Sequence, residues 1–570
     1  MGGGVDGDIV GAAAGSDDGD DVGHGGEGVL GEASAGAMDP DDLRALGGFD
    51  RLVFGGALVD DELEVAVVKP SGNPIGDVGG GVGEQGETFD VGGGDHGSDS
   101  WGSWDLDETV YVKGVNNAGG RGWWRGAGRL RYGAFCRCEP EGNGQMERDT
   151  AFEMATSNIR YGPGVVREVG MDFVDMGAKR VALMTDAHLA GLAPVANVRQ
   201  SLEDAGVDYE VYDRVQVEPT DGSFKDAIGF AEAGGFDAFV AVGGGSTIDT
   251  AKAANLYSTY PADFLDYVNA PIGKGKPVPG ALKPLIAVPT TAGTGSETTG
   301  VAIFDLESMH AKTGIAHRRL KPTLGIVDPQ NTRTLGHTAA ASTGLDVLSH
   351  AIESYTAIPF DRRPKPDRPV MRPAYQGSNP ISDIWSLKAL RMVDGYLIRA
   401  VEHPEDEEAR GMMLLAAAFA GMGFGNAGVH LPHGMSYPVS SMVRSYRPAD
   451  YPVDHALVPH GTSVILNAPA VFRFTASACP GRHLAAAAAL GANVSGASDG
   501  DAGDVLADRI IYFMKTLKVP NGLSAVGYEA GDIPKLVEGT LPQHRVTKLS
   551  PREADEAALT GLFEDAMTYW

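Results

Sequence analysis

The chain has 570 residues and a formal net charge of −30, from 76 Asp and Glu against 46 Lys and Arg. At about 150 residues per domain, this length corresponds to three or four domain-sized units and is ample for a large core. An acidic chain repels phosphate, which argues against a nucleic-acid partner. The sequence has no apolar run of about 18 residues, so we expect no membrane span, and its three cysteines are too few for a disulfide framework.

Residues 1–148 form a low-complexity segment rich in Gly and Asp. Residues 1–150 hold 38 of the 80 Gly residues and 29 acids against 10 bases, so −19 of the charge lies there. Such a composition has too little apolar surface to offset the entropy cost of ordering, and we expect disorder. The apolar stretch 52–68 is the one candidate for a strand pair.

A basic stretch from Thr109 to Cys138 interrupts this segment and contains no acid. A basic, acid-poor composition is typical of organelle-targeting segments, but this one lies internally and follows an acidic N-terminus. Two interpretations stay open, a drift of composition in a disordered tail and a displaced transit peptide.

After Phe152 short apolar runs alternate with helical stretches. The runs RVALMTD (180–186), FDAFVAVGGGS (236–246) and PLIAVPTTAGTGSE (284–297) end in Gly, Thr or Asp, as buried strands of a parallel sheet do. From about Gly344 the periodicity becomes helical. We therefore predict an α/β nucleotide-binding domain over residues 149–332 and an all-helical domain over 333–570.

Two loops rich in Gly and hydroxyl groups follow two of the predicted strands. Gly243-Gly244-Gly245-Ser246, with Asp249 one turn on, joins a strand to a helix and predicts a phosphate cradle at the helix start. The loop 289–297 offers hydroxyls to a ribose or pyrophosphate. A tight turn and a capping box are the structural alternatives. Both loops belong at the carboxyl edge of one sheet, where such sheets bind ligands.

Asp186 closes an earlier strand and has two readings. An acid at a strand end binds the ribose 2′-hydroxyl and repels a 2′-phosphate, which favours NAD over NADP. A helix N-cap is an equally good interpretation of this residue alone.

The helical half contains a candidate metal site. Asp346 and His350 are four residues apart and share a helix face, and His433 and His460 follow, each before a Gly. One carboxylate with three imidazoles suits Fe(II) or Zn(II). His430 and His455 lie close enough to His433 and His460 in the sequence to be alternative metal ligands.

Together, GGGSTID, PTTAGTGSE, DVLSHAIE, HGMSYP and PHG resemble the iron-containing (group III) alcohol dehydrogenase family over residues 149–570. The resemblance implies a dehydroquinate synthase-like fold, with an α/β NAD-binding domain and a helical metal-binding domain. It implies metal ligation by Asp346, His350, His433 and His460, because the register of Asn426-Ala427 selects His433 and the Pro-His-Gly tripeptide selects His460. With Gly243 of the cradle, the implied cofactor contacts are Asp186, Gly244, Gly245, Ser246, Asp249, Thr290, Thr291, Thr294, Thr299 and Lys312.

The resemblance extends to members that transfer hydride between a hydroxy acid and an oxo acid through tightly bound NAD and a divalent metal, Fe(II) or Zn(II). It implies oxidation of 4-hydroxybutyrate to succinate semialdehyde, coupled to reduction of 2-oxoglutarate to 2-hydroxyglutarate, in the mitochondrion. An ordinary NAD-dependent alcohol dehydrogenase is the alternative, and a metal-dependent lyase or synthase on the same scaffold is a remote one.

Three further expectations concern the substrates and the assembly. Tyr437 stands where many family members have a His, and its hydroxyl is a candidate proton relay. Both substrates carry a distal carboxylate, so the site needs a cation, for which Arg372, Arg444 and Arg447 are candidates. We expect small hydroxy-acid and oxo-acid substrates, a homodimer, and neither a nucleic-acid nor a membrane partner.

Overall fold

The computed structural model describes residues 147–570, except 310, 452 and 454, and before them the backbone of three strands. These strands are β1 (Glu64–Val68), β2 (Thr109–Val115) and β3 (Arg121–Ala127), which form a sheet in the order β1-β2-β3. The expectations for the rest of residues 1–148, including the choice between a disordered tail and a transit peptide, lie outside the described residues.

The first half of the described chain is built on six parallel strands in the order β4-β11-β8-β7-β5-β6. Their bounds are β4 (Asn158–Tyr161), β5 (Arg180–Met184), β6 (Asp208–Tyr212), β7 (Ala238–Gly243), β8 (Leu285–Pro289) and β11 (Leu324–Val327). From β5 the chain runs outward to β6 and then returns past β5 to β7. The direction of winding therefore reverses between β5 and β7, where open α/β sheets bind their ligands.

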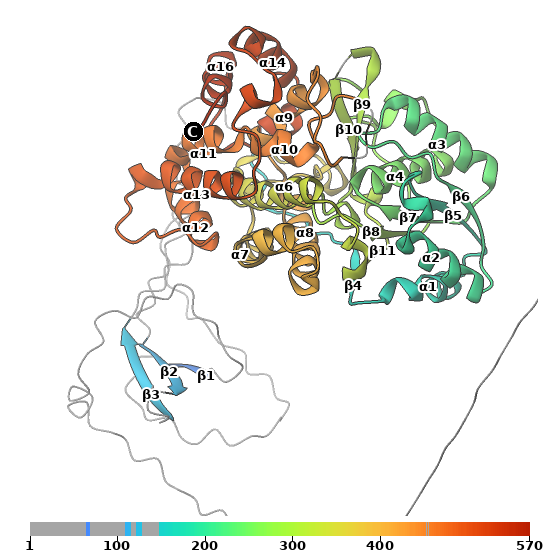
Figure 1. The fold of residues 1–570 in the computed structure, drawn as a ribbon, viewed down its shortest axis with the longest axis horizontal. Helices are drawn as coiled ribbons and strands as arrows, with labels where there is room; N and C mark the ends of the chain where they lie inside the picture. Colours follow the sequence, from blue (N-terminus) through green and yellow to red (C-terminus); the bar gives the residue numbers. More distant parts are fainter. Residues whose placement is uncertain are drawn as a thin grey trace, which may run out of the picture. The chain divides into compact units, whose positions relative to one another are not determined.

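Helices cover both faces of this sheet (Figure 1, green). Alternate strand residues point to opposite faces, so Val181 and Leu183 of β5 pack with α1 (Val169–Asp175) and α2 (Ala193–Asp204). Ala182 and Met184 pack on the other face with α3 (Asp221–Gly234) and α4 (Gly245–Thr259). Burial on both faces explains why the inner strands β5, β7 and β8 are nearly continuous apolar runs.

Between β8 and β11 the chain forms an antiparallel hairpin of β9 (Val301–Leu306) and β10 (Ala311–Ala316). Apolar side chains of the hairpin pack against α4 in a core of their own, beside the short helix α5 (Phe264–Tyr267). Strand β10 also contacts α9 of the helical half. The hairpin thus carries Lys312 towards the junction of the two halves.

The second half is helical, as predicted. Its helices are α6 (His337–Thr356), α7 (Pro380–Glu402), α8 (Glu407–Ala427), α9 (Leu431–Ser441), α10 (His460–Ile465), α11 (Ala468–Thr475), α12 (Pro480–Ala489), α13 (Ala502–Thr516), α14 (Ile533–Thr540), α15 (His544–Thr547) and α16 (Glu556–Asp565). Capping residues in the sequence mark where two of these helices begin. Asn379 caps α7 ahead of Pro380, and Asp406 caps α8.

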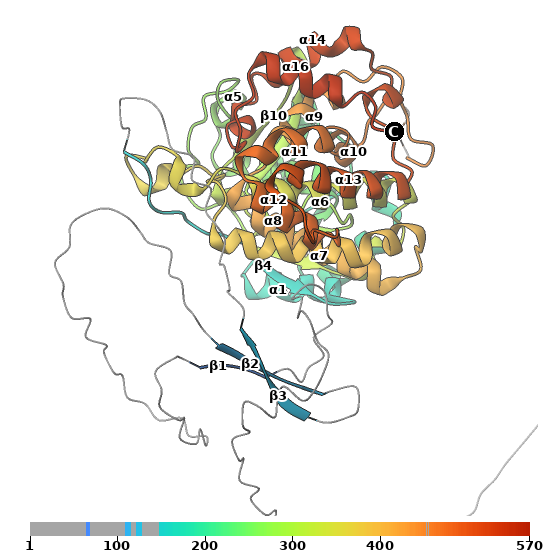
Figure 2. The same ribbon diagram turned by 90° about the vertical axis from the view of Figure 1, so that its left-hand side faces the viewer.

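Helix α6 lies at the centre of this half and is buried along nearly its whole length. It packs against α7, α8 and α10, and the views in Figures 1 and 2 place α7 and α8 on one side of it and α9 and α10 on the other. A helix enclosed on all sides needs no polar face. The polar residues that α6 does bury therefore require partners inside the protein.

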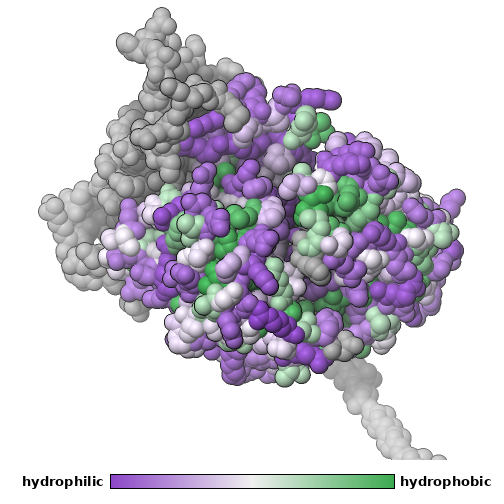
Figure 3. All heavy atoms as spheres, turned by 90° about the horizontal axis from the view of Figure 1, so that it is seen from above, coloured by the Kyte–Doolittle hydropathy of each residue, from purple (hydrophilic) through white to green (hydrophobic). Residues whose placement is uncertain are grey.

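The face of the described residues seen in Figure 3 is mostly polar. Hydrophilic side chains predominate on it, with smaller hydrophobic groups between them. Among the described residues no single helix has the length and hydropathy of a membrane span, and only α8 and α9 reach these limits as a pair bent by 105°.

The two halves meet with their backbones in contact at Gly295 and Gly421. Gly295 has φ +56°, and a Cβ there would lie 2.7 Å from the carbonyl oxygen of Ala417 and 2.8 Å from Cα of Gly421 in α8. Both features require glycine, the first for backbone conformation and the second for close packing.

We expect Gly295→Ala to lower the free energy of unfolding by about 1–3 kcal/mol more than Gly177→Ala, because it adds steric overlap to the same backbone strain. Gly177 is the matched control, since it has φ +73° and nothing within 4 Å of a Cβ. Denaturant titration measures both. Equal losses would contradict close packing at the junction.

Candidate active site

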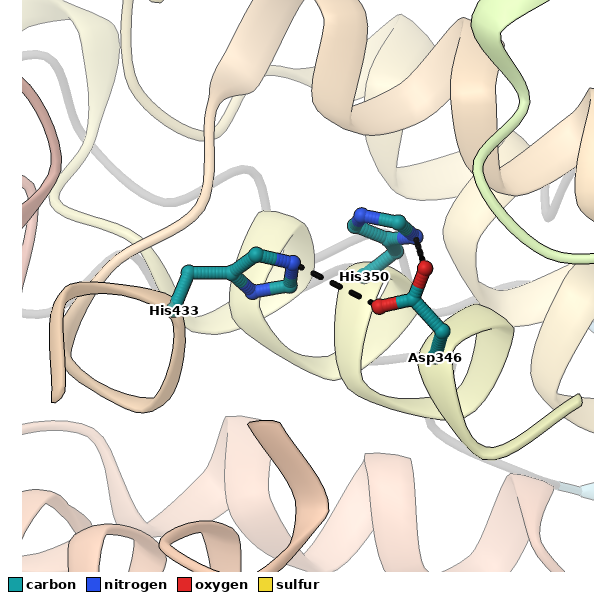
Figure 4. A group of neighbouring side chains, drawn as sticks. All are labelled: Asp346, His350 and His433. Carbon is teal, nitrogen blue, oxygen red and sulfur yellow. Dashed lines mark ion pairs between the residues drawn. The ribbon is translucent and has the colours of Figure 1, made fainter. Parts of the chain in front are cut away.

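Three of the four predicted metal ligands meet in the interior, two from α6 and one from α9 (Figure 4). Nδ1 of His350 lies 3.7 Å from Oδ2 of Asp346, and Nε2 of His433 lies 3.5 Å from Oδ1 of the same carboxylate. The ring of His350 stacks on Phe424 with centroids 3.9 Å apart. One donor atom from each of the three residues falls within 4.8 Å of the others.

His460, the fourth predicted ligand, opens α10 and places Nε2 3.8 Å from Oδ1 of Asp346. Gly461 makes this possible, because a Cβ there would lie 2.0 Å from the carbonyl oxygen of Ser342 in α6. The glycine that follows the histidine in the sequence thus lets α10 approach the helix that carries Asp346 and His350.

The donor atoms lack hydrogen-bond partners. Oδ1 of Asp346, Nδ1 of His350 and Nε2 of His433 are all buried without one among the described residues. Buried polar atoms of folded proteins are normally paired, and an unpaired group costs about 1–3 kcal/mol. A carboxylate and imidazole nitrogens are the donors that a borderline divalent cation accepts, so these residues fit such an ion.

Glu353, one turn beyond His350 on α6, orients His433. Its Oε1 lies 2.6 Å from Nδ1 of His433, and its Oε2 accepts a 2.6 Å hydrogen bond from the backbone N–H of His430. A proton on Nδ1 leaves the lone pair of Nε2 free to face Asp346. Such carboxylate–histidine pairs set the tautomer and basicity of metal-binding imidazoles.

The electrostatics of the group favour a cation. Burial lowers the pKa of His350 to about 3, so its imidazole is neutral and has a lone pair to donate. Burial acts in the same direction on His433, but the carboxylates of Glu353 and Asp346 outweigh it and raise its pKa to about 10. A metal that binds Nε2 of His433 would therefore displace a proton from it. Burial alone would raise the pKa of Asp346, yet the surrounding imidazoles hold it well below its ordinary value.

The rival histidines lie outside this group. Nε2 of His430 is 3.0 Å from the hydroxyl of Thr356, and its ring faces Phe472 edge-on. His455 is exposed. The geometry therefore favours His433 and His460, the pair that the resemblance implies.

A cavity of about 110 Å³ connects the histidines to the end of the sheet. Six of the expected cofactor residues line it, together with the histidines of the metal group and Tyr437. The lining residues are Glu218, Pro219, Gly245, Ser246, Asp249, Thr294, Ser296, Thr299, Val301, Ile303, Lys312, His350, Tyr375, Phe424, Val429, His433, Tyr437, His460 and Arg545. Gly243, Gly244, Thr290, Thr291 and Asp186 do not line it.

The two Gly/hydroxyl loops pack directly against each other at the sheet edge. The backbone N–H of Thr290 donates to the carbonyl of Gly243 at 3.1 Å. A Cβ on Gly244 would lie 3.2 Å from the side chain of Thr291, and one on Gly245 would lie 2.6 Å from that of Thr294. The glycines therefore allow close packing between loops as well as an open helix start for a phosphate.

Asp249 is held by a buried lysine that the sequence reading missed. Nζ of Lys252 bonds to Oδ1 of Asp249 at 3.2 Å, the hydroxyl of Ser296 at 2.6 Å and the carbonyl of Val301 at 2.8 Å. Oδ2 of Asp249 accepts from the backbone N–H of Ile303. Asp249 thus connects α4 to the second Gly/hydroxyl loop (289–297) and to the hairpin of β9 and β10. The sequence signal for this ion pair was the spacing of three residues between Asp249 and Lys252 within one predicted helix.

Lys312 is engaged by two carboxylates of this cavity region. Its Nζ lies 2.6 Å from Oε2 of Glu218 and 2.9 Å from Oδ2 of Asp305. Glu218 itself sits at φ +54°, a strained conformation for a residue with a side chain, and such strain clusters at functional sites. No sequence signal marked Glu218.

Asp186 acts as a cap in this structure. Its Oδ1 accepts hydrogen bonds of 2.9 Å from the backbone N–H groups of His188 and Leu189. Its position after β5, beside the reversal of winding, suits a ribose contact equally. The cofactor role of Asp186 stays a prediction.

The arginines expected to bind the substrate carboxylate are placed elsewhere. Arg372 pairs with buried Asp149 at 2.9 Å, Arg444 pairs with Asp532, and Arg447 bonds to the carbonyl of Val453. None of the three lines the cavity. The arginine that does line it is Arg545, in the short helix α15. No sequence signal marked this residue.

Comparison with known protein families shows where this chain belongs. A sequence model of the iron-containing alcohol dehydrogenase family matches residues 156–329, and one of the C-terminal part of Fe-containing alcohol dehydrogenases matches residues 374–567. The chain belongs to the iron-containing alcohol dehydrogenase family. It is therefore an oxidoreductase, and the resemblance predicted from its motifs is confirmed.

Relatives and solved structures agree. The chain is 63% identical to the mitochondrial hydroxyacid-oxoacid transhydrogenase of Rattus norvegicus over 421 residues, 74% of this chain and 90% of the relative. The structure of alcohol dehydrogenase from Oenococcus oeni matches with TM-score 0.64 and 27% identity, over 73% of this chain and all of that one. Sulfoacetaldehyde reductase from Bifidobacterium kashiwanohense, in complex with NAD⁺, matches with TM-score 0.60 and 26% identity over 73% and 98%.

We expect Glu353→Gln to weaken metal binding by about 10- to 100-fold, the usual effect of removing a carboxylate that orients a ligand imidazole. Competition between the protein and a chelator for Zn²⁺ measures this. Glu402→Gln is the matched control, because it removes a carboxylate 3.3 Å from His337 and away from the cavity. Unchanged affinity in Glu353→Gln would contradict the orienting role.

Burial raises the pKa of Glu297, the last residue of the loop 289–297, from 4.5 to about 7. The folded protein therefore binds this proton more tightly than the unfolded chain, and stability is lost as pH rises from about 4.5 to 7. Glu297→Gln removes this loss, so its stability relative to the parent grows across that range by up to about 3 kcal/mol. Urea unfolding at several pH values measures the difference, and a constant difference would contradict it.

Proposed function

We propose that the chain is a mitochondrial hydroxyacid-oxoacid transhydrogenase. It oxidises 4-hydroxybutyrate to succinate semialdehyde and reduces 2-oxoglutarate to 2-hydroxyglutarate, through tightly bound NAD and a divalent metal, Fe(II) or Zn(II). The observation that carries the chemistry is a single cavity lined by both groups of residues. These are the Gly/hydroxyl loops of the sheet edge and the histidines, two of which have a buried ring nitrogen without a partner among the described residues. The identity of 63% to the rat transhydrogenase over 74% of the chain supports the substrate class and the compartment.

The residues divide the work between the two halves of the chain. Asp346, His350, His433 and His460 would hold the metal, since their donor atoms converge and three of them lack partners. When bound, the metal supplies a Lewis acid for the substrate oxygen and NAD supplies the hydride acceptor. Glu353 keeps the imidazole of His433 in the tautomer that ligation requires.

On the sheet side, Gly245 and Ser246 open α4 at the cavity, where backbone N–H groups of a helix start bind a phosphate. Gly243, Gly244, Thr290, Thr291 and Thr294 belong to the same pair of packed loops, and Thr299 lies two residues beyond the second loop. Asp249, Lys312 and Asp186 complete the proposed cofactor contacts.

The test uses the purified protein with 4-hydroxybutyrate and 2-oxoglutarate and without added NAD. We expect 2-hydroxyglutarate and succinate semialdehyde to form in equal amounts, measured by mass spectrometry. Turnover of 4-hydroxybutyrate only when free NAD is supplied would contradict the proposal and indicate an ordinary alcohol dehydrogenase. Metal analysis of the same sample distinguishes iron from zinc.

A further inference from the structure

We propose that Arg545 and Tyr437 together bind the distal carboxylate that both substrates share, and so determine the specificity of the enzyme for acids. This inference rests on the proposed function. It replaces the arginines expected from the sequence and gives Tyr437 a role in holding the substrate.

The two substrates present the same geometry to the site. In 4-hydroxybutyrate the carbon that carries the hydroxyl is separated by three bonds from the carboxylate carbon. In 2-oxoglutarate the keto carbon is separated by three bonds from the distal carboxylate carbon. One cation at a fixed distance from the metal group therefore serves both half-reactions.

Two cationic side chains other than histidine line the cavity, Lys312 and Arg545. Lys312 is already matched by the carboxylates of Glu218 and Asp305. Arg545 has no carboxylate partner among the described residues, and Tyr375 and Tyr437 are its neighbours. The guanidinium is half-buried and its Nη1 atom is fully buried. Burying part of a charged group without a counter-ion is costly, and a substrate carboxylate compensates for it.

The contacts of Arg545 leave donors free for such a carboxylate. Its Nη2 donates a 3.0 Å hydrogen bond to the hydroxyl oxygen of Tyr437, whereas its Nη1 is buried with no partner in the described part of the chain. The guanidinium also lies 5.0 Å from the centroid of the Tyr375 ring. Because Tyr437 accepts from Arg545, its own O–H remains to donate. Nη1 and this hydroxyl give a carboxylate two donors.

The helices place this pair at a suitable distance from the histidines. Tyr437 follows His433 by four residues on α9, a rise of about 6 Å along the helix, which is comparable to an extended three-bond carbon chain with its end groups. Gly434 lets α15 approach α9, because a Cβ there would lie 2.8 Å from Cγ2 of Thr547. Arg545 on α15 thus reaches the cavity beside Tyr437.

The first test compares Arg545→Met with the parent protein on two substrates. One is 4-hydroxybutyrate, and the other is 4-hydroxybutyramide, which has nearly the same shape without the charge. We expect kcat/KM for the acid to fall roughly 10- to 100-fold, as for a lost hydrogen bond to a charged group, mainly through KM. The value for the amide should stay close to that of the parent.

Lys548→Met is the matched control. Lys548 is three residues from Arg545 and exposed, and it lines a neighbouring cavity of about 1100 Å³ but not the reaction cavity. Lys548→Met removes the same charge as Arg545→Met but at a residue that does not line the cavity of the histidines. This variant should therefore keep the parent's preference for 4-hydroxybutyrate over the amide. Arg545→Lys keeps the charge, should restore part of the preference, and serves if Arg545→Met fails to fold.

Tyr437→Phe separates carboxylate binding from proton relay. Loss of a carboxylate donor raises KM for both acids and leaves the pH dependence of kcat unchanged. A reduced kcat with a shifted pH profile and an unchanged KM would overturn the role of Tyr437 in binding.

The outcomes separate this inference from the proposed function. If the parent enzyme transfers hydride between the two acids and Arg545→Met and Arg545→Lys retain the parent's preference for acid over amide, the inference is wrong and the function stands. If the parent enzyme shows no such transfer and no preference for the acid, the proposed function fails, and the inference fails with it.

Discussion

The burial of a carboxylate and two imidazoles at α6, with a third imidazole half-buried beside them, is the constraint on which the rest of the structure depends. Ionised and polar side chains are costly in an apolar interior unless they are paired or bound to a metal. Asp346 and His350 lie on a helix that is enclosed by α7, α8 and α10. Their placement is tolerable only because histidines from two further helices converge on the same carboxylate and Glu353 fixes one of them.

This convergence depends on close backbone approaches. Gly461 lets α10 touch α6, and Gly434 lets α15 touch α9. Gly295 and Gly421 bring the second loop of the sheet edge against α8. Any side chain at these positions would separate the elements that hold the histidines, the two loops of the sheet edge and Arg545. The glycines after the histidines therefore serve the geometry of the site, although none of them supplies a donor side chain.

Charge pairing then distinguishes the cations of the cavity region. Lys252 is paired with Asp249 and hydrogen-bonded to Ser296 of the loop 289–297. Lys312 is paired with Glu218 and Asp305. Both stabilise the framework to which the two loops of the sheet edge belong. Arg545 is held instead by two tyrosines and keeps donors free for an anion, so it is the cation that a substrate carboxylate meets.

Sequence alone determined much of this protein. Strand and helix periodicity gave the order of the α/β and helical halves, and local motifs gave the two loops and the aspartate–histidine pair, because each of these signals lies within a few neighbouring residues. Periodicity did not indicate that Lys252 reaches across to Ser296, that Glu353 orients His433, or that Arg545 lines the reaction cavity. Arg372 and Arg444 looked equally suitable in the sequence, and their pairing with Asp149 and Asp532 removed them. Only the tertiary structure decides such choices, since the partner that neutralises a charge or leaves it free comes from a distant part of the chain.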